Sequence, residues 1–233
     1  MSREESMSLE DSLWRDSSAP VKPGPAWGMV VEREVVEREI LEREEDVGVI
    51  RAREALLELS RTAALAAQTL PTQIAEAGAV CAESIRGGGK ILACGNGGSA
   101  ADAQHFVAEL IGRMGMERAA LPAVSLTVDP SVITCIANDY GYEEVFARQV
   151  RGLGRPGDVL VGMSTSGTSK NVLAALDAAN ELGMTTIAIV GQAGSPAADL
   201  VLRAPSRHTA RVQEIHTAAL HAICDVAEQL LFG

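Results

Sequence analysis

Residues 90–110 read KILACGNGGSAADAQHFVAEL, so a short apolar run, a glycine-rich turn and a helical stretch follow directly on one another. The apolar run lacks the alternation of a half-exposed strand, which is typical of a strand covered on both faces. The segment after the glycines contains strong helix formers. This strand–loop–helix order predicts the first unit of an α/β fold.

The same order recurs along the chain. Four further apolar segments are expected to form strands, at 123–128, 158–165, 185–191 and 199–204. Helices are expected over 99–114, around 142–153, over 169–183 and over about 210–231, with a short turn near Pro196. Two helical runs, 49–70 and 71–86, precede the first strand, and Pro71 stands where a proline opens a helix. The sequence therefore predicts a parallel, doubly wound sheet in three αβα layers with two leading helices.

The first 47 residues differ from the rest. They hold 13 acidic and 6 basic residues, against 18 acidic and 14 basic in residues 48–233. Residues 1–28 are rich in Ser, Pro, Gly and acids, which predicts disorder. Residues 30–46 contain the near-repeat VEREV, VEREI, LEREE, whose spacing does not keep the apolar pairs on one helical face. We expect an acidic extension over 1–47, either a solubilising tail or a partner-binding arm, followed by one folded domain over 48–233.

Composition excludes several classes of function. The folded part is only mildly acidic and aromatic residues make up 3% of the chain, which argues against direct binding of nucleic acid. No apolar run approaches the roughly 18 residues that span a membrane, and the N-terminus lacks the pattern of a secretion signal. The four cysteines are scattered without CxxC spacing. We expect reduced, buried thiols in a cytoplasmic protein with no membrane partner.

Two loops at the ends of predicted strands carry candidate ligand groups. They are CGNGGS at 94–99 and STSGTS at 164–169. Small residues, free N–H groups at a helix start and hydroxyl donors favour a phosphate. The first loop is not a dinucleotide fingerprint, because Ala100 stands in place of the third glycine and no suitable acid ends the next strand. The second loop suits a terminal phosphomonoester, although both loops could be ordinary helix N-caps.

A possible metal or acid–base site lies on two predicted helices. His105 and Glu109 are four residues apart, so they share a helical face. On the last helix, Gln213 and His221 are spaced so that they can converge on one site. These four side chains could hold a divalent metal or transfer protons, and their spacing does not choose between the two. His208 is expected to be an ordinary surface or hydrogen-bonded histidine.

Four segments together resemble the sugar isomerase (SIS) domain family: GNGGSAADAQHFVAEL at 95–110, CIAND at 135–139, STSGTS at 164–169 and ARVQEIHTAALH at 210–221. The resemblance covers about residues 48–233 and is closest to the bacterial phosphoheptose isomerases, which act on sedoheptulose 7-phosphate. It implies a five-stranded, flavodoxin-like sheet. It also implies a homotetramer with active sites between subunits and a place at the first step of nucleotide-activated heptose biosynthesis.

The resemblance also implies roles for individual residues. The phosphate site would comprise Ser164, Thr165, Ser166 and Ser169. Contacts to the rest of the substrate would come from Asn96, Gly97, Gly98, Ser99, Glu109, Asn138, Asp139 and Gln213. One zinc ion per subunit would be held by His105, Glu109, Gln213 and His221. Glu109 and His221 would form the acid–base pair that moves a proton through an enediol.

Two other functions occur in the same family. One is a non-catalytic tetrameric scaffold that binds the bacterial replication initiator, and the other is a regulatory module that senses a sugar phosphate. A scaffold would not need the acid–base pair that Glu109 and His221 preserve here. A sensor is usually fused to a DNA-binding or kinase-like domain, and none is visible in the sequence. The site residues therefore favour an isomerase.

Overall fold

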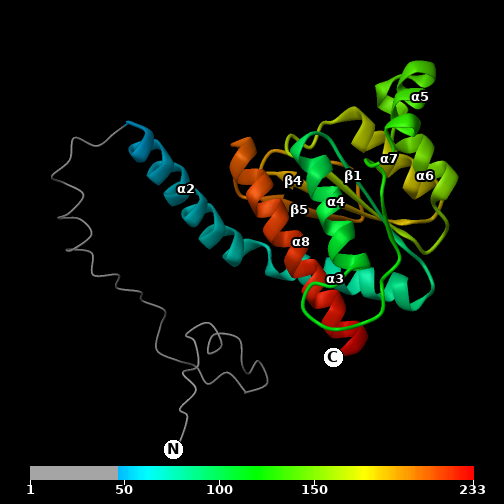
Figure 1. Cartoon of the computed structure of the whole chain (residues 1–233), viewed down its shortest axis with the longest axis horizontal. Helices are drawn as coiled ribbons and strands as arrows, with labels where there is room; N and C mark the ends of the chain where they lie inside the picture. Colours follow the sequence, from blue (N-terminus) through cyan, green and yellow to red (C-terminus); the bar gives the residue numbers. More distant parts are fainter. Residues whose placement is uncertain (1–46) are drawn as a thin grey trace, which may run out of the picture. The chain divides into compact units, whose positions relative to one another are not determined.

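The structure is a computed structural model that describes residues 47–233 (Figure 1). The predicted acidic extension lies outside the described residues except for Val47. Helices and strands alternate after two leading helices, as expected. The elements are α2 (Val47–Thr69), α3 (Pro71–Arg86), β1 (Ile91–Gly95), α4 (Gly98–Ile111), β2 (Ala123–Ser125), α5 (Pro130–Tyr140), the 3₁₀ helix η2 (Tyr142–Glu144), α6 (Ala147–Leu153), β3 (Val159–Ser164), α7 (Lys170–Glu181), β4 (Thr185–Gly191), β5 (Leu200–Ala204) and α8 (Thr209–Phe232).

The five strands form one parallel sheet in the order β2-β1-β3-β4-β5, which confirms the predicted sheet. The chain runs outward in one direction from β1 to β2 and in the other from β3 to β5, so the order reverses between β1 and β3. Gly95 pairs with Met163 in the register of these two strands. The loops that follow β1 and β3 therefore leave the sheet side by side, at the place where such folds bind ligands.

Alternate residues of each strand face opposite layers of helices, which confirms the three-layer prediction. Ile91 and Ala93 of β1 belong to a core shared with α3, α4 and α8, whereas Leu92 and Cys94 belong to a core shared with α5, α6 and α7. Figure 1 shows these two groups of helices around the sheet. Three of the four free cysteines are buried, as expected, and Cys135 is exposed.

Helix α5 was not predicted from the sequence. It begins at Pro130, and the Asp129 carboxylate accepts hydrogen bonds from the N–H groups of Ser131 and Val132. An Asp–Pro pair is a sequence signal for a helix start, so the information was present. The helix expected around 142–153 is instead divided into η2 and α6. The short turn expected near Pro196 lies at residues 192–193.

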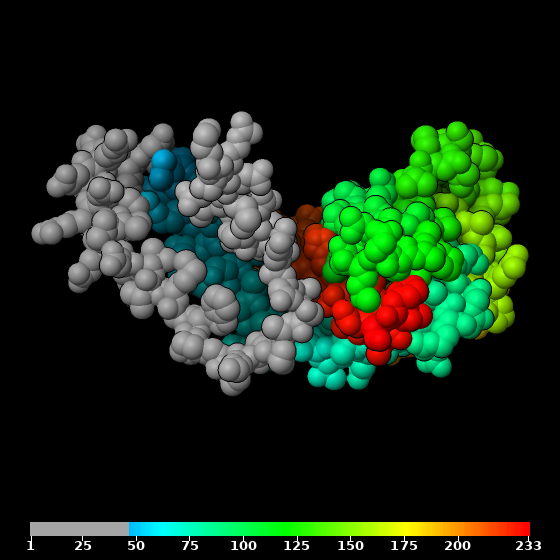
Figure 2. All heavy atoms as spheres, turned by 60° about the horizontal axis from the view of Figure 1, so that its bottom comes forward, coloured from blue at the N-terminus to red at the C-terminus, as the bar shows by residue number. Residues whose placement is uncertain are grey.

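A buried ion pair anchors the segment that follows α4. The Glu228 carboxylate, on α8, accepts hydrogen bonds at 3.1 Å from the N–H groups of Met114, Gly115 and Met116, and Arg118 lies 2.7 Å from it. Both charged side chains are only 1% exposed. Burial alone raises the pKa of Glu228, but these N–H groups and Arg118 together hold it below its usual value. In Figure 2 the red end of α8 lies beside the green surface.

Helix α2 is attached to α8 through Arg211. Its guanidinium donates a 2.6 Å hydrogen bond to the carbonyl of Ala55 and lies 3.4 Å from Glu58. Much of the apolar surface of α2 is uncovered, since Leu56 is 67% exposed and Leu57 and Leu65 are nearly half exposed. No helix within residues 47–233 is both long and apolar enough to cross a membrane.

Candidate active site

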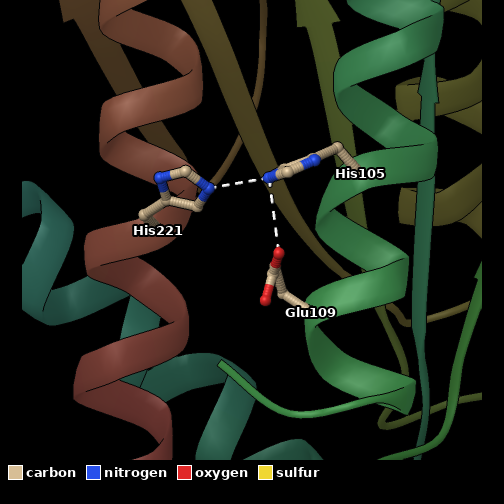
Figure 3. A group of neighbouring side chains, drawn as sticks. All are labelled: His105, Glu109 and His221. Carbon is tan, nitrogen blue, oxygen red and sulfur yellow. Dashed lines mark hydrogen bonds and ion pairs between the residues drawn. The ribbon is translucent and has the colours of Figure 1, made fainter. Parts of the chain in front are cut away.

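Two helices bring three ionisable side chains to one point. Helix α4 starts at the glycine turn after β1 and carries His105 and Glu109 one turn apart, and α8 packs beside it with His221. The Nε2 atoms of the two histidines are 2.7 Å apart, and His105 Nε2 lies 3.4 Å from a Glu109 oxygen. Figure 3 shows the three side chains pointing into the space between the helices. The structure thus brings together three of the four residues considered as metal ligands.

The three side chains have the composition of a metal-binding group. One ligand atom from each lies within 4.8 Å of the other two. Two imidazole nitrogens and a carboxylate oxygen are donors that Zn²⁺ accepts in proteins. The group therefore fits a divalent cation, and the same carboxylate and imidazoles are suited to proton transfer.

Gln213, on α8, lies beside the first turn of α4. Its side-chain amide lies against Gly98, so closely that a Cβ atom at position 98 would overlap Gln213 Nε2. Gly98 thus leaves the space that the Gln213 amide occupies at the start of α4. The neighbouring Ser99 is buried against Gly95, whereas Gly97 and Gly98 are exposed.

Asn96 joins the loop after β1 to the first turn of α7. Its Nδ2 donates to Asn171 Oδ1 and its Oδ1 accepts from Asn171 Nδ2, both at 2.8 Å. The hydroxyl of Tyr142 also donates to Asn96 Oδ1, at 3.1 Å. Asn171 and Tyr142 were not predicted as site residues, because only the packing of distant segments brings them to Asn96. The Asn96 side chain therefore holds the loop after β1 against α7 and η2.

The hydroxyl-rich loop after β3 is organised around Ser164, which is buried. Its Oγ lies 2.9 Å from Ser169 Oγ and accepts a 3.0 Å hydrogen bond from the Gly167 N–H. Ser166 Oγ similarly accepts from Thr168 Oγ1. Ser169 is the N-cap residue of α7, but its side chain makes no capping hydrogen bond. The hydroxyls are thus gathered in the loop rather than used as ordinary helix caps.

Asn138 and Asp139 lie at the exposed end of α5. Asn138 Nδ2 donates a 2.7 Å hydrogen bond to Asp139 Oδ1. Among the hydrogen bonds of residues 47–233, neither side chain bonds to the loops after β1 and β3. Within residues 47–233, this pair is therefore not linked to those loops by side-chain hydrogen bonds.

Asp102 is a further acidic group beside the site that was not singled out from the sequence. It lies one turn before His105 on α4, and its Oδ1 accepts a 2.9 Å hydrogen bond from Thr217 Oγ1 on α8. Its Oδ2 is buried and has no hydrogen-bond partner among the described residues. Burial raises the pKa of Asp102, and the Thr217 bond and the nearby His105 oppose this shift. A half-satisfied carboxyl thus lies next to the cation-binding group.

His216 is fully buried between α8 and the sheet. Neither ring nitrogen meets hydrogen-bond geometry with a described residue. The nearby Val190 backbone only partly opposes the lowering of the His216 pKa. Burial lowers the pKa of this imidazole to about 4. The side chain is therefore neutral at ordinary pH and takes no part in the cluster around His105.

Replacing His216 with leucine is expected to flatten the pH dependence of stability between about pH 6.5 and pH 4. The unfolded chain binds a proton below the ordinary pKa of 6.5, whereas the folded protein excludes it until about 4. The wild-type free energy of unfolding therefore falls as the pH drops through this window. At about 1.4 kcal/mol per pKa unit the fall reaches roughly 3 kcal/mol. Urea unfolding at several pH values, with a chelator present throughout, measures it.

A matched control is His208→Gln, because His208 is exposed at the start of α8. This variant should keep the wild-type slope. If His216→Leu also kept that slope, His216 would not be the group that binds the proton on unfolding.

Several known proteins are similar to this chain in sequence and in fold. The sequence profile of the SIS domain family matches residues 57–191. A phosphoheptose isomerase from Alkalilimnicola ehrlichii is 52% identical over 182 residues, which cover 76% of this chain and 93% of that protein. The solved phosphoheptose isomerase from Neisseria gonorrhoeae has a TM-score of 0.72 at 45% identity, over 77% of this chain and 97% of that one. The enzyme from Francisella tularensis has a TM-score of 0.75 at 36% identity, over 79% and 100%.

Proposed function

The chain belongs to the SIS domain family, and within it to the phosphoheptose isomerases, and from this premise we propose that it converts sedoheptulose 7-phosphate into D-glycero-D-manno-heptose 7-phosphate. This reaction is the first step of nucleotide-activated heptose biosynthesis. The observation that carries the proposal is the convergence of Glu109 and His221, with His105, between α4 and α8. A scaffold of the same fold has no use for this pair.

The chemistry requires a base and an acid at neighbouring carbon atoms. An aldose–ketose isomerisation moves a proton between C1 and C2 through an enediol. We assign the Glu109 carboxylate to the carbon-bound proton and the His221 imidazole to the oxygens. Glu109 is 22% exposed, so it is reachable from the space between the helices while partly shielded from water. The two residues come from different helices, so the substrate would be held between them.

We propose that the cation-binding group holds zinc, with His105, Glu109 and His221 as ligands and Gln213 as a fourth. When bound, zinc would polarise the substrate oxygens and favour the enediol. Glu109 has two carboxylate oxygens, so one can serve as a ligand while the other remains available to a proton. The Nε2 atoms of His105 and His221 face each other at 2.7 Å, so both imidazoles point to the place where the cation would be held.

The hydroxyl loop is the proposed phosphate site. Ser164 shapes the loop from inside, which leaves Ser166, Ser169 and the first N–H groups of α7 to meet phosphate oxygens. Thr165 lies in the same loop and is only partly exposed. Binding energy at this remote group can be used to orient the reacting carbons.

We also propose that the chain forms a homotetramer. Support comes from the uncovered apolar side chains of α2 and from an apolar groove of about 200 Å³ beside them. The groove is lined by Ala63, Ala66, Ala67, Leu70, Pro71, Ile74, Ile215, Ala218 and Ala219. Further copies of the chain would cover both surfaces. Sedimentation of the purified protein should give the mass of four chains, and a monomer would contradict the proposal.

The direct test is incubation of the purified protein with sedoheptulose 7-phosphate, with and without a chelator. We expect an aldoheptose 7-phosphate as product, loss of activity with chelator and recovery when zinc is added back. Product analysis by nuclear magnetic resonance and a metal count by elemental analysis provide the measurement.

Activity that survives complete removal of metal would show that zinc is not needed for turnover. Absence of product under every metal condition would contradict the isomerase assignment and favour the scaffold.

A further inference from the structure

The turn that follows β4 lies directly against the hydroxyl loop. The Gly191 N–H donates a 3.1 Å hydrogen bond to the carbonyl of Thr165. Gly167, with φ of +70°, is so close to Gly194 that a Cβ atom at position 167 would overlap Gly194 Cα. Both glycines are buried. The two loops therefore touch backbone to backbone, and neither can shift without the other.

Arg203 fixes this turn from the edge strand β5. Its Nε donates a 2.9 Å hydrogen bond to the carbonyl of Gly194, and its Nη2 lies 3.5 Å from Ser195 Oγ. Within the turn, the Gly194 N–H bonds to the Gly191 carbonyl at 3.1 Å. Arg203 supplies both of the side-chain hydrogen bonds made to residues 192–195 by the described part of the chain.

We propose that Arg203 is a positioning residue for the phosphate group of the substrate. It holds Gly194 in place, Gly194 presses on Gly167, and Gly167 keeps the hydroxyls and N–H groups of residues 164–169 converged. A wider spread of these donors would weaken their grip on a phosphate without moving Glu109 or His221. The proposal rests on the proposed function, because it takes residues 164–169 as the phosphate site.

Arg203→Gln and Arg203→Lys are expected to raise KM for sedoheptulose 7-phosphate about tenfold while kcat stays within about twofold, since each loses a charge-assisted hydrogen bond to Gly194. The dissociation constant of inorganic phosphate, measured by calorimetry, should rise by a similar factor. The lysine variant keeps the charge but cannot present the Nε–H donor from the same place. Full recovery with lysine would show that charge acts here and would overturn the positioning role.

Gly194→Ala provides a second, independent variant. A Cβ atom there would lie 2.8 Å from Val190 Cβ and 3.0 Å from Gly167 Cα, so the turn must move. We expect the same rise in KM and in the phosphate dissociation constant, with kcat retained. The matched control is Arg155→Gln, an exposed arginine before β3 at the opposite end of the sheet, which should leave both quantities unchanged.

The two readouts separate this proposal from the function itself. If the wild type binds phosphate but makes no aldoheptose phosphate, the proposed reaction fails while the calorimetry still tests Arg203. If the Arg203 and Gly194 variants bind phosphate as tightly as the wild type, the positioning role is wrong whatever the reaction. A fall in kcat with unchanged KM would also overturn it.

Discussion

Replacing Glu109 with glutamine is expected to lower kcat by about a thousandfold, in the range that a general base contributes, while KM changes only a few fold. Glutamine has nearly the same shape and keeps one oxygen towards His105, but it cannot accept the proton from carbon. The measurements are turnover and the exchange of substrate C–H protons with deuterated water. Turnover and exchange should be lost together, because both need the base.

The control for this variant must separate a base from a metal ligand. Metal content measured on the purified variant and activity with excess zinc make that distinction. Excess zinc can refill a site that a lost ligand has weakened and so restore activity, but it cannot replace a lost base. Glu76→Gln, an exposed carboxylate on α3, should behave as the wild type. Near-normal turnover of Glu109→Gln would remove Glu109 from the role of base.

Replacing Glu228 with glutamine is expected to lower the free energy of unfolding by about 3–5 kcal/mol, the cost of breaking a buried ion pair. The change leaves Arg118 buried without a counter-charge. In the wild type, the backbone N–H groups of Met114, Gly115 and Met116 donate to the Glu228 carboxylate. The amide of glutamine would direct an N–H donor of its own towards them. Urea unfolding at pH 7 and at one protein concentration measures the difference, because self-association would add to stability.

The matched control is Glu144→Gln, which removes the nearer of the two carboxylates beside Arg151 at the surface. Their side chains are 38% and 47% exposed, so this change should cost less than about 1 kcal/mol. The double variant Arg118→Met with Glu228→Gln should recover part of the loss, since it leaves no buried charge and keeps an amide oxygen for the backbone N–H groups. Equal costs for Glu228→Gln and Glu144→Gln would contradict the role given to the buried pair.

The sheet could be predicted from the sequence because its strands are covered on both faces. Each appears as a short, continuous apolar run, and its helical neighbours have the composition of helices. Helix α5 is indicated in the sequence by its start alone, where Asp129 and Pro130 have the composition of a helix N-terminus. Strand β2 is shorter than the apolar run that predicted it, since its pairing with β1 ends at Ser125.

Less of the site could be predicted from residue spacing. The four-residue interval placed His105 and Glu109 on one face, but only the packing of α8 beside α4 brings His221 to them. The links from Asn96 to Asn171 and from Arg203 to Gly194 join residues that are not neighbours along the chain. No local pattern marks such contacts, because they depend on how the loops after the strands pack against other elements of the fold.

The contact between Gly98 and Gln213 has a consequence for how this sequence can vary. A side chain at position 98 requires the Gln213 amide to move from the space above it, although the two positions lie on different helices. Their substitutions are therefore coupled. A library that randomises position 98 alone should return mostly glycine, whereas one that also allows a smaller residue at 213 should return alanine at 98 more often. Which residues can replace Gly98 therefore depends on a side chain more than a hundred residues later in the sequence.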